Sequence, residues 1–227
     1  MKTGYEYYDE GLSYPCTNES ILAVLSGLSP NRKDVAVLVA GSGDIPFAIA
    51  PYVDKVYAVD KNEHQLNFIR EQMGLLRERD NNFFRDNFVL EESDNFFDVC
   101  LEDFANRKKY FSNKFKSVVK SLDKIELVSG NIFDVARDLG KNGDIFDRFY
   151  VSNAMDYGAP FSLCSFDDSL SGLRTGGLFY DASCSEDIKA AENYFSKSLV
   201  LDKARTIKAR AGESGKIKWH PAVYRKI

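Results

Sequence analysis

The sequence VAVLVAGSGDIPFAIAPYVDKVYAVD, from Val35 to Asp60, places a glycine-containing turn and a short helix-like segment between two apolar runs. This order predicts a strand, a turn, a helix and a second strand ending in an acid, as in one half of an open parallel α/β sheet. Because Gly41 and Gly43 lack a Cβ, the backbone can turn sharply there and a ligand can lie against it. The carboxylate of Asp60 can accept hydrogen bonds from a ribose diol. We therefore predict a nucleoside-binding site at this turn.

The composition of the turn favours one class of nucleoside. Pro46 stands where the dinucleotide fingerprint has its last small residue, and no Gly-Lys-Ser/Thr follows to cradle a triphosphate. Asp44 would repel a pyrophosphate, but it suits a ligand that carries an amino group and a sulfonium. The turn thus favours S-adenosylmethionine over NAD or ATP. The alternative interpretation is a buried parallel strand with a tight turn and no ligand.

The composition of the whole chain is that of an ordinary globular protein. With 227 residues and 44% hydrophobic content, we expect one well-cored domain over residues 1–227. A net charge of −4 argues against a nucleic-acid binder that uses its whole surface. The four cysteines and two histidines form no ligand-spaced cluster, so we expect no metal site. Reduced cysteines, no secretory signal and no apolar run of about 20 residues predict a cytoplasmic protein.

The N-terminal residues 1–29 are predicted to form a flap or tail followed by a helix. The tyrosine-rich segment from Met1 to Ser13 is too polar for a core strand, and flap and tail are both open. From Thr17 to Leu28 the apolar residues share a helical face, with Thr17 or Asn18 as the cap and Pro30 as the stop. We expect this helix to pack beside the first strand.

Two further helices are predicted after Asp60. Asn62 to Arg79 begins with a capping-box pattern and carries apolar residues at helical spacing. Residues 81–124 are too apolar for a linker and too long for a simple loop, which predicts a packed helical insertion. Its second half, from Arg107 to Lys124, is a basic amphipathic helix. Packing inward with solvated lysines outside is favoured over contact with an anionic surface or membrane headgroups.

The second half of the sheet supplies further candidate site residues. A strand from Ile125 to Val128 leads to Asn131, whose side chain can hydrogen-bond an adenine edge while Ile132 offers apolar contact. A strand from Asp147 to Asn153 leads to Asp156 and Tyr157, the leading catalytic candidates, because polar residues at this end of a central strand face the ligand crevice. For Asp156 the alternative is a turn-forming role before Gly158. The predicted ligand-contacting residues are Ala40, Gly41, Ser42, Gly43, Asp44, Asp60, Lys61, Asn131, Ile132 and Asn153.

The remaining elements complete an alternating α/β plan. The predictions are a helix from Phe166 to Leu173 closed by Gly176 and Gly177, a strand from Leu178 to Ala182, and a helix from Ser185 to Ser198. Alternating apolar residues in Leu199 to Ala209 and Lys216 to Lys226 predict a terminal antiparallel hairpin.

Taken together, GSGD, AVD, GN and the polar turn after the later strand resemble the class I S-adenosylmethionine-dependent methyltransferase fold over about residues 30–227. The predicted fold is therefore α/β and Rossmann-like, with a mostly parallel sheet, a terminal antiparallel hairpin and a helical insertion. More narrowly, LSYPCTNESILAVLSGL, AVDKNEHQLNFIREQMGLLRE and FDRFYVSNAMDYGAPFSL resemble the diacylglycerol 3-amino-3-carboxypropyltransferase family of betaine-lipid synthesis. In that family an AVD-x-N-x-x-Q helix follows the second strand and a later strand ends in x-D-W/Y, here Ala58 to Gln65 and Met155 to Tyr157.

The resemblance implies S-adenosylmethionine as co-substrate and transfer of its 3-amino-3-carboxypropyl group to an unidentified small-molecule or lipid acceptor, with release of methylthioadenosine. Asp156, with Tyr157, would orient or deprotonate that acceptor. One alternative is methyl transfer to a small molecule, which differs only in which carbon beside the sulfonium is attacked. A second alternative is a module that binds S-adenosylmethionine without turnover. A nucleic-acid partner is not expected.

Overall fold

The computed structural model describes residues 17, 19–78, 101–157, 163–193, 195, 197–213 and 219–227, with the side chains of 101–105, 156, 157 and 163–165 left out. The segment from Met1 to Ser13 and the first part of the phenylalanine-rich insertion lie outside the described residues. No helix in the described ranges is long and apolar enough to cross a membrane.

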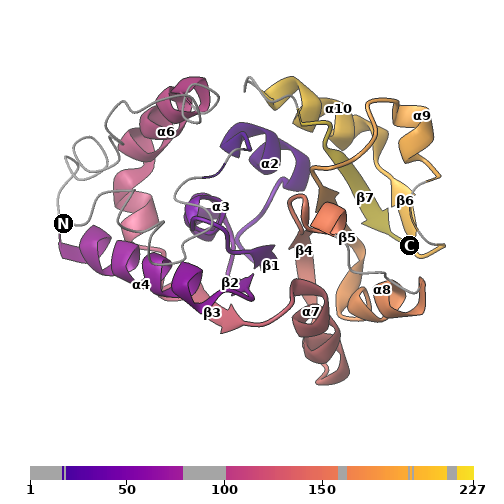
Figure 1. Ribbon diagram of the computed structural model, residues 1–227, viewed down its shortest axis with the longest axis horizontal. Coiled ribbons are helices and arrows are strands. Elements are labelled where there is room, and N and C mark those ends of the chain that lie inside the picture. Colours follow the sequence, from indigo (N-terminus) through magenta and orange to yellow (C-terminus); the bar gives the residue numbers. More distant parts are fainter. Residues whose placement is uncertain are drawn as a thin grey trace.

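The described chain forms a seven-stranded sheet in the order β3-β2-β1-β4-β5-β7-β6 (Figure 1). Strands β1 to β5 pair in parallel, and β7 lies antiparallel between β5 and β6. This order with one antiparallel strand near the edge defines the class I methyltransferase fold, so the predicted fold class is confirmed. The strands are β1 (Val35–Val39), β2 (Lys55–Asp60), β3 (Ile125–Ser129), β4 (Phe146–Tyr150), β5 (Leu173–Asp181), β6 (Leu199–Leu201) and β7 (Ala222–Lys226).

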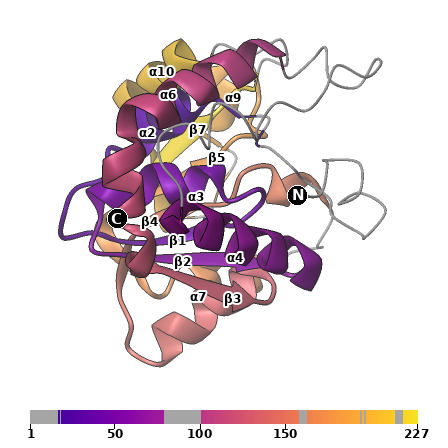
Figure 2. The ribbon, with the colours of Figure 1, turned by 90° about the vertical axis from the view of Figure 1, so that its left-hand side faces the viewer.

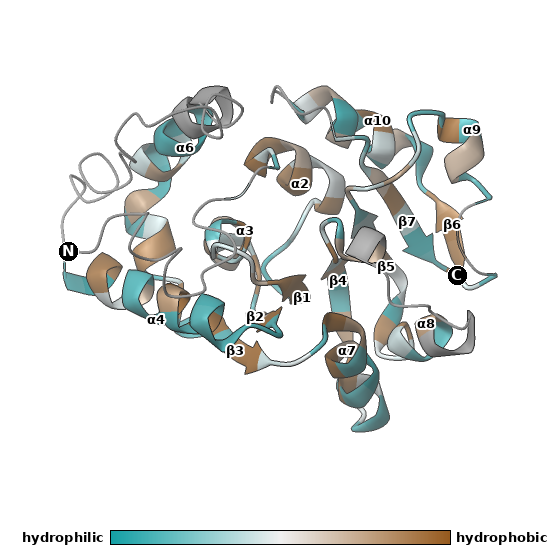
Figure 3. Cartoon of the chain, in the orientation of Figure 1, coloured by the Kyte–Doolittle hydropathy of each residue, from teal (hydrophilic) through white to brown (hydrophobic). Residues whose placement is uncertain are grey.

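Helices cover both faces of the sheet, which explains why β1 is apolar at every position. Ala36, Val37 and Leu38 are all fully buried, and they contribute alternately to the cores on the two faces. One face is covered by α2 (Ile21–Leu28), α3 (Asp44–Ile49), α4 (Glu63–Glu78), α6 (Leu101–Val119) and α10 (Lys203–Gly212). The other carries α7 (Ile132–Lys141), α8 (Leu163–Ser169) and α9 (Ile188–Ala191), and Figure 3 shows apolar residues on the strands between the two layers.

Two predicted helices are confirmed by α4 and α6, although α6 begins before Arg107 and ends at Val119, and Leu122–Lys124 form a separate 3-10 turn. Helix α4 begins after Asn62, whose Oδ1 accepts a hydrogen bond from the backbone of His64 at 3.0 Å. In α6, Phe111 and Phe115 are buried while Lys109 and Lys116 are exposed, as the amphipathic pattern predicts. The hydroxyl of Tyr110 donates to the carbonyl of Ala48 at 3.1 Å, so α6 lies against the end of α3 (Figure 2).

The N-terminal helix differs from its prediction in cap and in partner. Helix α2 is capped by Ser20, whose Oγ accepts from the backbone of Ala23, and not by Thr17 or Asn18. It packs against α10 and the end of β5 instead of beside β1. The Ser20 hydroxyl donates to the carbonyl of Gly212 at 2.7 Å, and a Cβ at Gly27 would lie 2.7 Å from the ring of Tyr180.

The predicted terminal hairpin is only partly right. Strands β6 and β7 do pair antiparallel, but the chain turns into α10 directly after Leu201. Asp202 caps that helix by accepting a hydrogen bond from the backbone of Arg205 at 3.1 Å. The segment that follows, KARTIKARAG, consists mainly of good helix formers, so helix propensity and a strong cap outweigh the apparent alternation.

Two predictions in the segment before β6 are wrong in extent. Strand β5 begins at Leu173, so Gly176 and Gly177 lie within the strand and do not close the preceding helix. A Cβ at Gly177 would lie 2.7 Å from the carbonyl of Arg174, which explains a glycine there without a helix end. The helix expected from Ser185 to Ser198 is the short α9, capped by Asp187.

Candidate functional site

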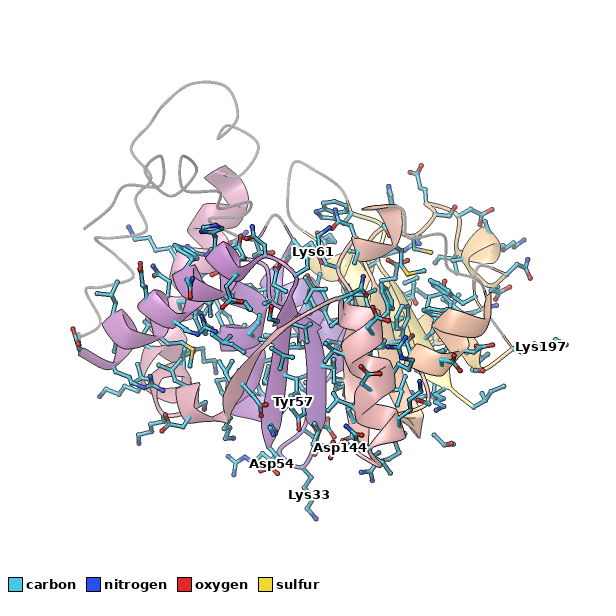
Figure 4. All side chains as sticks on the ribbon, turned by 60° about the horizontal axis from the view of Figure 1, so that its bottom comes forward. Lys33, Asp54, Tyr57, Lys61, Asp144 and Lys197 are labelled. Atoms are coloured by element: carbon cyan, nitrogen blue, oxygen red, sulfur yellow. The ribbon has the colours of Figure 1, made fainter. Side chains whose placement is uncertain are left out.

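The loops after β1, β2, β3 and β4 lie at one edge of the sheet, because these strands are parallel. Figure 4 shows Lys61, which follows β2, at that edge, whereas Lys33, Asp54 and Asp144 lie at the opposite edge. The strand order reverses between β1 and β4, and in open α/β sheets ligands bind in the crevice at such a switch point. Most of the predicted site residues therefore belong to one region.

The glycine turn has the backbone conformation that its sequence predicts. Gly41 and Gly43 have φ values of 49° and 90°, in the left-handed region that favours glycine. A Cβ at Gly41 would meet no atom of the described residues within 4 Å, so as far as these residues go the space beside its Cα is open to a ligand. A Cβ at Gly43 would instead lie 3.0 Å from the ring of Phe47 and 3.2 Å from Ile69, so that glycine is required by packing. The backbone of Ala40 donates to the carbonyl of Val59 at 2.8 Å and holds the turn beside β2.

Asp60 lies at the end of β2 beside this turn and is half-buried. Its Oδ1 accepts a hydrogen bond from the backbone of Asn62 at 2.9 Å. Burial raises the pKa of the Asp60 carboxyl, and hydrogen bonds from the backbones of Asn62 and Gly41 oppose that increase. Lys61 is exposed. A carboxylate in this position, next to the open side of Gly41, can accept the two hydroxyls of a ribose.

Asn131 lies at the end of the neighbouring strand. The backbone of Gly130 donates to the carbonyl of Asp60 at 2.9 Å, so the two strand ends are joined. Asn131 is exposed and caps α7, because its Oδ1 accepts from the backbone of Phe133 at 2.9 Å. Ile132 is buried in the core on the α7 side of the sheet.

Asp44 has a partner that sequence reasoning missed. Its carboxylate receives two hydrogen bonds from the guanidinium of Arg107, at 2.7 and 2.6 Å, and both side chains are buried. The Ser42 hydroxyl and the backbone of Thr17 also donate to it, each at 2.9 Å. Asp44 thereby anchors α6 and the segment before α2 to the glycine turn. One signal was present in the sequence: Arg107 lies one turn before Phe111 on the apolar face of its helix.

The turn after β4 carries the predicted catalytic residues. The chain leaves the sheet after Tyr150, earlier than predicted, and Ser152 adopts a left-handed φ of 55°. Asn153 is half-buried next to it. Asp156 and Tyr157 lie in the short helix η4 (Ala154–Tyr157), but their side chains lie outside the described residues.

Glu19, which sequence reasoning did not select, lies at this edge as well. It is 2% exposed, and the Ser152 hydroxyl donates a hydrogen bond to its Oε1. Burial raises the pKa of Glu19 to about 7, while hydrogen bonds from Ser152 and Tyr150 oppose the increase. Acidic residues are common near the start of a helix, so Glu19 looks ordinary in the sequence and nothing there predicts this contact.

The residues at the edge of the sheet fit an adenosine-containing ligand. The open space beside Gly41, the half-buried carboxylate of Asp60 and the exposed amide of Asn131 occupy three adjoining loops. Within the described ranges, no group of three or more His, Cys, Asp or Glu side chains could hold a metal ion.

Comparisons with known proteins agree with the fold and go no further. No family model matches the sequence, and no curated protein matches it. TrmN from Thermus thermophilus matches with a TM-score of 0.50 and 14% identity, over 97% of this chain and 52% of that chain. A putative methyltransferase from Streptococcus mutans in complex with SAH and a putative rRNA-methylase from Clostridium thermocellum give TM-scores of 0.45 and 0.48, with 11% and 9% identity. Each of these two covers 100% of this chain and 99% of its own.

Proposed function

We propose that this protein is an S-adenosylmethionine-dependent methyltransferase that acts on a small molecule. The observation that carries the proposal is the meeting of the glycine turn, Asp60 and Asn131 at the carboxyl ends of adjoining parallel strands. The strand order of the sheet, which is that of class I methyltransferases, supports it.

Each of these residues has a distinct part in the proposed site. Bound S-adenosylmethionine supplies an electrophilic carbon next to a sulfonium. The open backbone at Gly41 allows the ligand to approach closely, Asp60 accepts hydrogen bonds from the ribose hydroxyls, and Asn131 lies where it can bind the adenine edge. Asp156 and Tyr157, on the turn after β4, are the candidates for orienting the acceptor or removing its proton.

Transfer of the 3-amino-3-carboxypropyl group uses the same nucleoside site. That reaction rests on the sequence resemblance alone, and neither the family models nor the curated proteins support it. Methyl transfer is therefore the reaction we propose.

The nucleoside that is released decides between the reactions. Purified protein is incubated with S-adenosylmethionine and a fractionated cell extract, and the products are identified by mass spectrometry. S-adenosylhomocysteine above the level of a heat-inactivated control supports methyl transfer, whereas methylthioadenosine would replace it with aminocarboxypropyl transfer. Calorimetric titration with S-adenosylhomocysteine tests the site itself: no binding would overturn the proposal, and binding without either product in any fraction would favour a non-catalytic module.

A further inference from the structure

Glu19 is a buried carboxyl group with one oxygen left over. Its Oε1 accepts a hydrogen bond from Ser152, whereas its Oε2 is buried and has no hydrogen-bond partner among the described residues. A buried polar atom of this kind is costly unless a partner satisfies it, and it is therefore expected to have one in the working protein.

Glu19 lies at the switch point of the sheet, between the loops that follow β1 and β4. The backbone of Thr17 donates to Asp44 in the glycine turn, and the backbone of Glu19 donates to the hydroxyl of Thr17 at 3.2 Å. On the other side, Ser152 belongs to the turn after β4, and its carbonyl accepts from the backbone of Ala182 at 2.9 Å. The Glu19 carboxyl thus bridges the segment beside the glycine turn and the loop of the neighbouring strand.

Among the described residues, the groups that shift the pKa of Glu19 are neutral or acidic. Tyr150 and Ser152 hydrogen-bond it, and the carboxylate of Asp181 at the end of β5 acts on it through space. The pKa of the buried Tyr180 hydroxyl is raised by burial and by the negative charges of Glu19, Glu213 and Asp181. Glu213 lies at the end of α10. Arg107 of α6 lines a small pocket together with Glu19, but its guanidinium is bound to Asp44. An ionised Glu19 therefore calls for a positive charge that these neighbours do not supply.

We propose that Glu19 binds the α-ammonium group of S-adenosylmethionine, with Oε2 as the acceptor. This inference rests on the proposed function. A ligand whose ribose is held at Asp60 and whose chain passes the open side of Gly41 reaches β4 as the next strand of the sheet, where Ser152 and Glu19 lie. Glu19 is then a binding residue that selects ligands by their charge, and it is distinct from Asp156 and Tyr157 on the acceptor side.

The decisive experiment is a cycle of one substitution and one ligand change. Binding of S-adenosylhomocysteine and of its analogue without the amino group, S-adenosyl-4-thiobutyrate, is measured by calorimetry for the wild type and for Glu19→Gln. We expect Glu19→Gln to weaken binding of S-adenosylhomocysteine by about thirtyfold or more, because one partner of a buried charge pair is lost. Binding of the analogue should be the same for both proteins. Glu126→Gln, the same chemical change on the edge strand β3, should leave both affinities unchanged.

A second readout separates direct contact from a structural role. In the protein without ligand the pKa of Glu19 is about 7, so Glu19 is mostly protonated at pH 6. Binding of an ammonium group should ionise it and release a proton from the wild type, whereas Glu19→Gln should release none. Titrations in two buffers of different ionisation enthalpy measure that proton.

The outcomes distinguish the two proposals. If the wild type binds S-adenosylhomocysteine but Glu19→Gln weakens both ligands equally or neither, the role of Glu19 is overturned and the proposed function stands. If the wild type binds neither ligand, both proposals fail.

Discussion

Arg107 of α6 and Asp44 of α3 form a buried, two-pronged ion pair, with Nε to Oδ2 at 2.7 Å and Nη2 to Oδ1 at 2.6 Å. Asp44 opens the helix that follows the glycine turn, so this pair attaches the insertion helix directly to the proposed ligand site. The shape of the turn therefore depends on α6.

Removing one partner of this pair should be strongly destabilising. We expect Arg107→Ala to lower the free energy of unfolding by about 3 to 5 kcal/mol, because it leaves the Asp44 carboxylate buried without its partner. Arg107→Lys keeps a charge but loses the fork, so it should recover only part of the stability. Urea unfolding followed by circular dichroism measures both. The double variant Asp44→Asn/Arg107→Leu should be more stable than Arg107→Ala, because it leaves no unpaired buried charge. A double variant with the same free energy of unfolding as Arg107→Ala would show that the unpaired charge is not the cause of the loss.

The two glycines of the turn should respond differently to alanine. Gly43→Ala should lower the free energy of unfolding by about 2 kcal/mol or more, since it adds a clash with Phe47 to a strained left-handed φ. The new methyl group of Gly41→Ala meets no atom of the described residues and should cost only about 1 kcal/mol, yet it enters the space proposed for the ligand. Thermal unfolding and titration with S-adenosylhomocysteine separate the two effects. If Gly41→Ala loses no more affinity for S-adenosylhomocysteine than its small loss of stability accounts for, as in Gly43→Ala, the proposed ligand contact at Gly41 would be contradicted.

Local patterns account for the parts of the fold and site that the sequence predicts well. An apolar run followed at once by GSGD predicts β1 and its turn, and the capping box at Asn62 with apolar residues at helical spacing predicts α4. These signals lie within a few residues of one another. Helix α10 shows the limit of such patterns, because its apolar residues also fit an alternating strand, and helix propensity together with the cap at Asp202 decides otherwise.

Contacts between residues far apart in the chain could not be predicted from the sequence. Arg107 and Asp44 are 63 residues apart, and Glu19 and Ser152 are 133 residues apart. Neither pair has a local signature, because each depends on how the insertion and the N-terminal segment fold back onto the sheet. For that reason the sequence predicts a ligand contact at Asp44 without its partner Arg107, and it contains no signal for Glu19.

Asp60 should matter for the ligand and little for the fold. We expect Asp60→Asn to weaken binding of S-adenosylhomocysteine at least about tenfold, because a charged acceptor of two hydroxyl hydrogen bonds is lost. Stability should change by less than about 1 kcal/mol, since the side chain is only half-buried and its raised pKa indicates that its charge is not stabilised by the fold. Asp54→Asn, at the opposite edge of the sheet in Figure 4, is the matched control and should bind normally. Normal binding of S-adenosylhomocysteine by Asp60→Asn would show that Asp60 does not bind the ribose.

The stability of the protein should fall as pH rises, through Glu19. Its pKa is raised from 4.5 in the unfolded chain to about 7 in the folded one, so the folded state holds the proton more tightly. The stabilisation is fully present below pH 4.5 and is lost as pH rises through 7, and it amounts to about 3 kcal/mol at most. Glu19→Gln cannot ionise, so it should gain stability relative to the wild type between pH 5 and pH 8 by most of this amount. Urea unfolding at the two pH values measures the difference, and parallel pH dependences for the two proteins would show that Glu19 keeps an ordinary pKa.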